Sequence, residues 1–90
     1  MNWKEMKEFC EKLNENQLSK NVVLWREDEA ITDIHPMQLE EDHYREHDSI
    51  YCMPESEARE IVKGEPEYPN GLSDMKKVYE KGHPILWEKF

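Results

Sequence analysis

His43 and His47 have the spacing closest to a metal-binding pattern in this chain. On a helix, residues four apart lie on the same face, so the two imidazoles could ligate one transition-metal ion, with Cys52 or an acidic side chain as a third ligand. The Glu that follows the first His in a zinc-protease helix is missing. Exposed polar side chains without metal, or a pH-sensitive histidine pair, are the competing interpretations.

The remaining reactive side chains do not form a catalytic pattern. Cys10 falls on an apolar helical stripe and Cys52 in a strand pattern, so we expect both thiols to be buried filling residues. The adjacent carboxylates Glu40, Glu41 and Asp42 could act in acid–base chemistry only in a pocket that changes their pKa values. No glycine-rich phosphate loop or nucleophile elbow occurs. The sequence therefore predicts no catalytic residue, no enzyme activity and no cofactor.

Negative charge is concentrated in the middle of the chain. Residues 27–67, here called the acidic segment, carry fourteen carboxylates against three bases, a net charge of −11, whereas residues 1–26 and 68–90 are each at +1. Phosphates and anionic lipids repel such a segment, because binding them depends on Lys and Arg. Direct binding of nucleic acid or membranes is therefore not expected.

A basic protein is the partner that this charge favours, since complementary potentials speed association and penalise wrong partners. Exposed aromatic residues such as Tyr44, Tyr51 and Tyr68 are the expected anchors. A solubilising surface without a partner is the alternative. The predicted partner-binding carboxylates are Glu27, Asp28, Glu29, Glu40, Glu41, Asp42, Glu55, Glu57 and Glu60.

The overall composition predicts one small folded domain over residues 1–90 in the cytoplasm. The chain has 90 residues, a net charge of −9 and only two cysteines, so it lacks the disulfide framework of small secreted domains. It has neither the apolar stretch of a signal peptide nor a membrane-spanning run. Three Trp, four Tyr and two Phe provide large side chains to bury. Because so short a chain has a thin stability margin, self-association is a third functional alternative.

The first element is predicted to be a helix capped by Asn2, with Glu5 as its capping-box partner. Its apolar stripe is expected to be core, packed on a short, mostly antiparallel sheet. Asn14 and Gln17 repeat the capping spacing and predict a further short helical turn. The stripe consists of Trp3, Met6, Phe9, Cys10 and Leu13.

Strands are expected in the next third of the chain. Residues 22–26 are predicted to be a strand buried on both faces, forming a hairpin with residues 30–35, which Pro36 would end. Residues 37–48 indicate a solvated loop or short helix. Residues 49–53 indicate a third strand.

A second helix is expected from Pro54 to Lys63 with Gly64 as its C-terminal cap. Residues 65–71 then form a loop by their Pro and Gly content. Residues 73–81 fit either a helix that Gly82 stops or an extended segment. The pattern as a whole predicts a small α+β domain.

Three fragments of the chain resemble a family of small, acidic, uncharacterised bacterial and phage-encoded proteins. They are the start Asn2-Trp3-Lys4-Glu5-Met6, the strand entry Asn16-Gln17-Leu18 to Asn21-Val22-Val23-Leu24-Trp25, and the end Gly82-His83-Pro84-Ile85-Leu86. The resemblance implies a one-domain α+β protein, favours the extended alternative near the end, and brings no known activity. It makes an inhibitor or neutraliser of a basic, nucleic-acid-binding protein the leading functional hypothesis. His83 is expected in a turn with its imidazole bonded to the backbone.

Overall fold

The structure is a computed structural model that describes residues 1–89, and it confirms the predicted α+β class. The chain folds as two compact units. Among the described residues, unit 1 comprises Met1–Ile34 with Glu88 and Lys89, and unit 2 comprises His35–Trp87. The expectation of a single domain stays a prediction.

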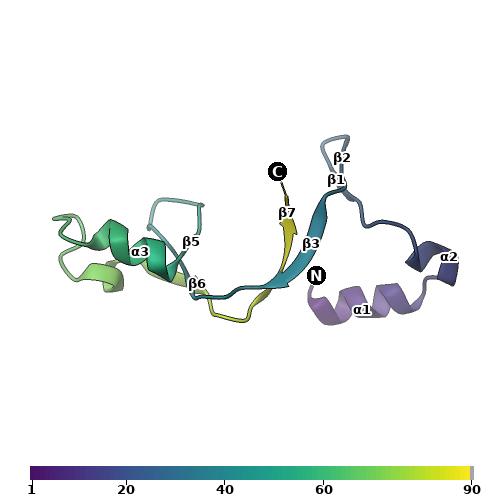
Figure 1. Ribbon diagram of the computed structural model, residues 1–90, viewed down its shortest axis with the longest axis horizontal. Coiled ribbons are helices and arrows are strands. Elements are labelled where there is room, and N and C mark those ends of the chain that lie inside the picture. The colour runs from purple at the N-terminus through teal and green to yellow at the C-terminus, as the bar shows by residue number, and fades with distance from the viewer. Residues whose placement is uncertain (90) are drawn as a thin grey trace. The chain divides into compact units, whose positions relative to one another are not determined.

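Unit 1 begins with two capped helices (Figure 1). Helix α1 spans Trp3–Glu11, and the Asn2 side chain accepts a hydrogen bond of 2.8 Å from the Glu5 amide, which confirms the predicted cap. Within residues 1–89 the Glu5 side chain does not return the second bond of the predicted capping box. Helix α2 spans Glu15–Leu18 behind a reciprocal capping box between Asn14 and Gln17, with bonds of 2.8 and 3.0 Å. These caps satisfy amides that a helix start leaves without partners.

The apolar stripe of α1 is not core, and this prediction is wrong. None of the residues of α1 is buried, the Phe9 side chain is 61% exposed, and Cys10 is exposed rather than a buried filling residue. The stripe faces a hollow of about 450 Å³ that α2 and residues 20–23 line on the other side. Helix α2 has only four residues, too few to cover a stripe of five residues that extends from Trp3 to Leu13.

A hairpin follows in unit 1, as predicted. Strand β1 (Leu24–Arg26) pairs antiparallel with β2 (Glu29–Ile31), and the register places Arg26 opposite Glu29. The prediction of a strand buried on both faces is wrong, because β1 is exposed throughout and Val22 and Val23 precede it. A two-stranded ribbon has no layers to bury both faces.

Strand β3 (Ile34–Gln38) contains Pro36, although the sequence predicts that this proline ends a strand. Within residues 1–89 its one partner is β7 (Pro84–Glu88), with which it forms a two-stranded sheet. Every strand of such a sheet is an edge, where proline's missing donor costs no ladder bond. The predicted strand over residues 30–35 is thus two strands with a break after Ile31.

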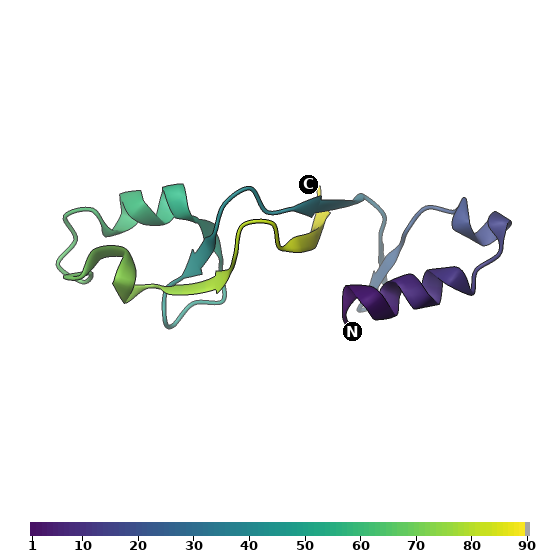
Figure 2. The same ribbon diagram turned by 90° about the horizontal axis from the view of Figure 1, so that it is seen from below.

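Unit 2 contains the hydrophobic core. A three-stranded antiparallel sheet has the order β5-β4-β6, from β5 (Met53–Pro54), β4 (His43–Arg45) and β6 (Lys76–Tyr79). Helix α3 (Glu55–Val62) contacts β4 and β5 of this sheet, and the 3-10 helix η1 (Gly71–Asp74), which precedes β6, contacts α3 (Figure 2). The buried centre is Ala58, Val62 and Met75, against which Tyr44, Met53, Ile61, Tyr68 and Leu72 pack.

Helix α3 confirms the predicted second helix, which Gly64 follows with a φ of +74° that favours glycine. Residues 76–79 are extended, so the extended alternative for residues 73–81 holds for these four residues, whereas residues 73 and 74 belong to the 3-10 helix η1. The loop or helix expected over residues 37–48 is instead interrupted by β4, whose partners β5 and β6 come later in the chain. The third strand, expected at residues 49–53, includes only Met53.

Candidate partner-binding site

The nine predicted partner-binding carboxylates form three groups. The first group is the turn of the hairpin in unit 1, the second precedes β4, and the third lies on α3, both in unit 2. In order they are Glu27, Asp28 and Glu29; Glu40, Glu41 and Asp42; and Glu55, Glu57 and Glu60. The continuous acidic segment of the sequence is therefore shared between two units.

Glu41 caps helix α3 from a distance of fifteen residues along the chain. Its carboxylate accepts 3.0 Å and 3.1 Å hydrogen bonds from the Ser56 amide and hydroxyl. The N-cap residue Pro54 provides no side-chain cap of its own. Because a carboxylate at a helix N-terminus satisfies free amides and meets the positive end of the dipole, Glu41 has a structural role.

Asp42 and Glu55 also have partners within unit 2. Asp42 accepts a 2.7 Å hydrogen bond from the Lys81 amide and lies 3.9 Å from the Lys77 ammonium. Glu55 pairs with Arg59, one helical turn on, at 2.7 Å. Because of these partners within unit 2, both carboxylates have less charge to offer a protein partner.

Five of the nine carboxylates form no hydrogen bond or ion pair within residues 1–89. All five side chains are exposed, so their charge is directed to solvent. They are Glu27, Asp28, Glu40, Glu57 and Glu60.

The two unpaired residues of the hairpin turn have an unusual backbone. Glu27 has a φ of 47° and Asp28 a φ of 65°, both in the left-handed region. Two consecutive residues with positive φ form a two-residue hairpin turn whose twist matches that of the flanking strands. Asn-Gly is the sequence that favours this turn most. A Glu side chain is costly there, at about 1 to 2 kcal/mol.

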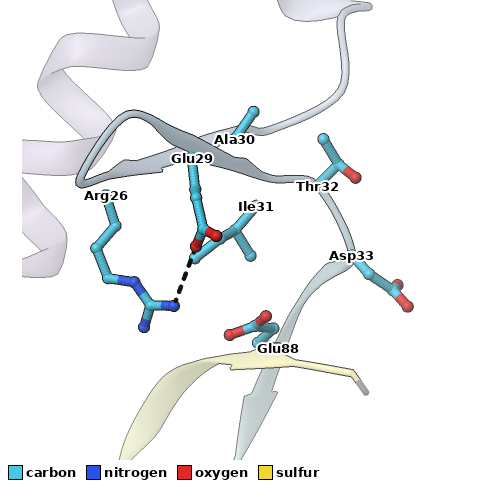
Figure 3. Close-up of a pocket in the computed structure, with 7 residues that line it drawn as sticks. All are labelled: Arg26, Glu29, Ala30, Ile31, Thr32, Asp33 and Glu88. Atoms are coloured by element: carbon cyan, nitrogen blue, oxygen red, sulfur yellow. Dashed lines mark ion pairs between the residues drawn. The ribbon is translucent and has the colours of Figure 1, made fainter.

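A polar hollow of about 410 Å³ lies beside this turn (Figure 3). The Arg26 guanidinium and the Glu29 carboxylate, 3.7 Å apart, extend from the hairpin toward the strand that carries Glu88. The Ile31 side chain extends from the hairpin on the same side. Ala30, Thr32 and Asp33 complete the lining. Three carboxylates against one guanidinium give the hollow a negative potential that suits a cationic group.

Arg26 and Glu88 are site residues that sequence reasoning missed. Glu88 is the last residue of β7 and lies 59 positions after Glu29 in the sequence. No local pattern could connect it with the hairpin, because the connection is made by the pairing of β3 with β7.

The three tyrosines predicted as anchors differ in exposure. Tyr44 and Tyr68 are half-buried and pack on the core, so their prediction as exposed anchors is wrong. The Tyr51 side chain is 78% exposed beside Ile50, which is 82% exposed. This pair forms an apolar tip between β4 and β5 in the acidic unit 2.

Tyr68 serves instead as a link within unit 2. Its hydroxyl donates a 2.5 Å hydrogen bond to the Glu46 carboxylate. This bond, with partial burial and the nearby charges of Glu46, Glu67 and Glu65, raises the pKa of Tyr68 to about 12. Each cause penalises the phenolate relative to the neutral phenol.

The residues of the metal alternative do not share a helix face. His43 lies in β4 with its Nδ1 atom 3.0 Å from the Glu41 carbonyl oxygen, while His47 is exposed in the following turn. Cys52 is exposed rather than buried in a strand. Among the described residues, no three His, Cys, Asp or Glu side chains are grouped to hold a metal ion.

His83 follows the turn that Gly82 makes with a φ of +92°. Its ring contacts the Tyr79 ring at a centroid distance of 4.9 Å, and its backbone amide donates a 3.0 Å hydrogen bond to the Glu80 carbonyl. The turn is as predicted, but the observed imidazole contact is aromatic.

Comparison with known proteins gives no relative: no family model, no curated protein and no solved structure matches this chain. The resemblance to small acidic bacterial and phage proteins therefore stays a prediction. Within residues 1–89, no helix has the length and apolar character needed to cross a membrane.

Proposed function

We propose that this protein is a non-enzymatic interaction module that binds a basic protein partner through the hairpin of unit 1. The observation that supports this most directly is the turn at Glu27 and Asp28, where two exposed carboxylates occupy left-handed positions. An Asn-Gly turn would be more stable in the same backbone. Acidic side chains that cost stability at an exposed tip suggest that their charge is used outside the chain.

The hollow beside the turn offers a place for the cationic side chain of the partner. A Lys or Arg head group could lie between the Glu29 and Glu88 carboxylates while its methylene groups contact Ile31. The exposed side chains of Arg26 and Glu29 form an ion pair with 3.7 Å between a guanidinium nitrogen and a carboxylate oxygen. Such exposed pairs are worth little, so an incoming cation can compete with Arg26.

Unit 2 provides a second acidic surface with an apolar anchor. Glu40, Glu57 and Glu60 supply unpaired charge, and Ile50 with Tyr51 supplies exposed apolar area. Aromatic anchors of this kind carry much of the energy of an interface. A nucleic-acid-binding protein is the partner class that the charge fits best, because its surface is built to meet phosphates.

The test is quantitative affinity capture from the native host with the whole chain as bait. The variant Glu27→Gln with Asp28→Asn keeps the turn but removes its two charges. It should capture about one tenth or less of the specific basic partner that the wild type captures. The matched control Glu8→Gln with Glu15→Gln removes two charges outside the acidic segment and should retain the partner fully.

Recovery should also fall steeply with salt, because the attraction is between exposed charges. Added double-stranded DNA should compete with the bait for the captured protein. Equal recovery by both variants, or capture only of acidic proteins, would contradict the proposal.

A further inference from the structure

Helix α1 leaves an apolar surface uncovered, here called the α1 face: Trp3, Met6, Phe9, Cys10 and Leu13. The Phe9 side chain is 61% exposed and that of Trp3 is 40% exposed. The hollow of about 450 Å³ beside the helix continues this surface to Leu18 and Val23, which are each 50% exposed. Contiguous exposed apolar surface with a polar rim is typical of an interaction site.

The charges around the α1 face indicate what covers it. The side chains lining the hollow, all among residues 1–23, include no carboxylate, and Lys20 is their one charged member. Residues 1–26 are at +1, whereas unit 2 carries twelve carboxylates against six bases. Two copies of this chain could therefore meet at the α1 face without the like-charge repulsion that unit 2 would cause.

The flanks of the α1 face carry the charges of a self-complementary surface. Successive helical residues are about 100° apart around the axis. This rotation places Lys7 and Glu11 on one flank of the apolar stripe, and Glu5 and Lys12 on the other. Lys12, the C-cap residue, keeps a right-handed helical backbone and so continues the pattern. Each flank thus carries one charge of each sign.

Two-fold symmetry makes use of this arrangement. In an antiparallel pair of helices related by a two-fold axis, each flank meets the same flank of the other copy, and residue i lies opposite residue j while j lies opposite i. Lys7 then meets Glu11 of the second copy, with the centre of symmetry at Phe9. On the other flank Glu5 meets Lys12, with its centre between Glu8 and Phe9. Both flanks therefore require nearly the same register.

We propose that a second copy of this chain covers the α1 face, in a two-fold antiparallel pairing of α1 helices centred near Phe9. The pairing buries the Phe9 side chains against one another and brings together four pairs of opposite charge. It gives the amphipathic stripe of α1 the apolar partner that unit 1 lacks. The surface uses no carboxylate of the acidic segment, so it is separate from the proposed partner-binding site.

Charge-swap variants test the pairing. Variant A, Lys7→Glu with Lys12→Glu, and variant B, Glu5→Lys with Glu11→Lys, each place like charges opposite one another at all four positions. Sedimentation analysis should show a wild-type dimer and a dissociation constant raised at least about tenfold in each variant alone. An equal mixture of A and B should restore the dimer as a heterodimer, because every pair is again of opposite sign.

Lys4→Glu and Glu8→Lys serve as controls, because both positions lie on the side of α1 away from the stripe, and both should dimerise as the wild type does. Phe9→Asp should be monomeric and still folded, since Phe9 is not buried in the single chain. In the wild type, the Cys10 thiol should react more slowly as protein concentration rises, while the exposed Cys52 serves as the internal standard.

A wild type that stays monomeric into the millimolar range would overturn the proposal and would leave the face for another protein's helix. A mixture of A and B that stays monomeric would overturn the antiparallel register. Either result leaves the proposed binding of a basic partner untouched, because the charges removed in that test, at Glu27 and Asp28, lie outside the α1 face.

Discussion

The hydrogen bond from the Tyr68 phenol to Glu46 links the stability of unit 2 to pH at the scale of a single residue. The folded-state pKa of Tyr68 is about 12, against an ordinary value of 10.0. Below pH 10 the phenol is neutral in both states and the bond contributes fully. Between pH 10 and 12 the unfolded chain releases the proton first, so the free energy of unfolding should fall as pH rises.

Urea unfolding of the wild type and of Tyr68→Phe across this range checks the prediction. The wild type should lose stability relative to the variant between pH 10 and 12. The difference between their phenolate absorbance titrations should give a midpoint near 12 for Tyr68 itself. Glu46→Gln should lower that midpoint, because the hydrogen bond to Glu46 is the largest cause of the shift. An unchanged midpoint in Glu46→Gln would show that this bond is not the cause.

At the scale of the element, the sequence predicts those features that depend on near neighbours. Asn2 and Gly64 mark the ends of α1 and α3 because capping is decided within a few residues. The prediction that Pro36 ends a strand fails because β3 lies in a sheet of only two strands, where a proline can be accommodated. The prediction for the stripe of α1 fails for a similar reason, since amphipathic spacing shows which residues share a face but not what covers it.

The acidic hairpin yields a prediction in which stability and binding move in opposite directions. Glu27→Asn with Asp28→Gly replaces the strained turn by the sequence that its left-handed backbone favours. The hairpin should gain about 1 kcal/mol or more of stability. Affinity for a basic partner should fall, because both tip charges are lost.

Urea unfolding followed by amide resonances of β1 and β2 measures the stability of this hairpin. Glu27→Gln with Asp28→Asn is the matched control, since it removes the same charges while keeping a larger side chain at the first position. It should weaken binding equally but stabilise the hairpin less. A loss of stability in the Asn-Gly variant would mean that the carboxylates support the turn and are not there for a partner.

At the scale of the whole molecule, the two units differ in how their apolar residues are used. The buried cluster of Ala58, Val62 and Met75 lies in unit 2, whereas Ile31 is the buried residue in the described part of unit 1. The sequence shows apolar residues in both parts and cannot assign them to core or surface. It shows the excess negative charge of residues 27–67 but not the boundary after Ile34, which assigns the hairpin turn to unit 1 and the later carboxylates of that segment to unit 2. Glu88 joins the candidate site because β3 pairs with β7, a pairing between distant segments that no local pattern predicts.

This difference predicts unequal protection of backbone amides from hydrogen exchange. Helix α3 and strand β4 contribute to the buried cluster or pack on it, so their amides should exchange only when unit 2 unfolds. Those of α1 have no buried face in a single chain, so a helix of nine residues should open readily and exchange many times faster. Dimerisation through the α1 face would cover the helix and slow its exchange as the protein concentration rises.

Exchange followed by mass spectrometry at several protein concentrations separates these contributions. Protection of α3 should be independent of concentration, and protection of α1 should increase with it in the wild type. Phe9→Asp should keep α1 at its low, concentration-independent protection while leaving α3 unchanged. If α1 in Phe9→Asp were as protected as α3, the helix would be held by contacts within the chain, and the uncovered stripe could not be what drives two copies together.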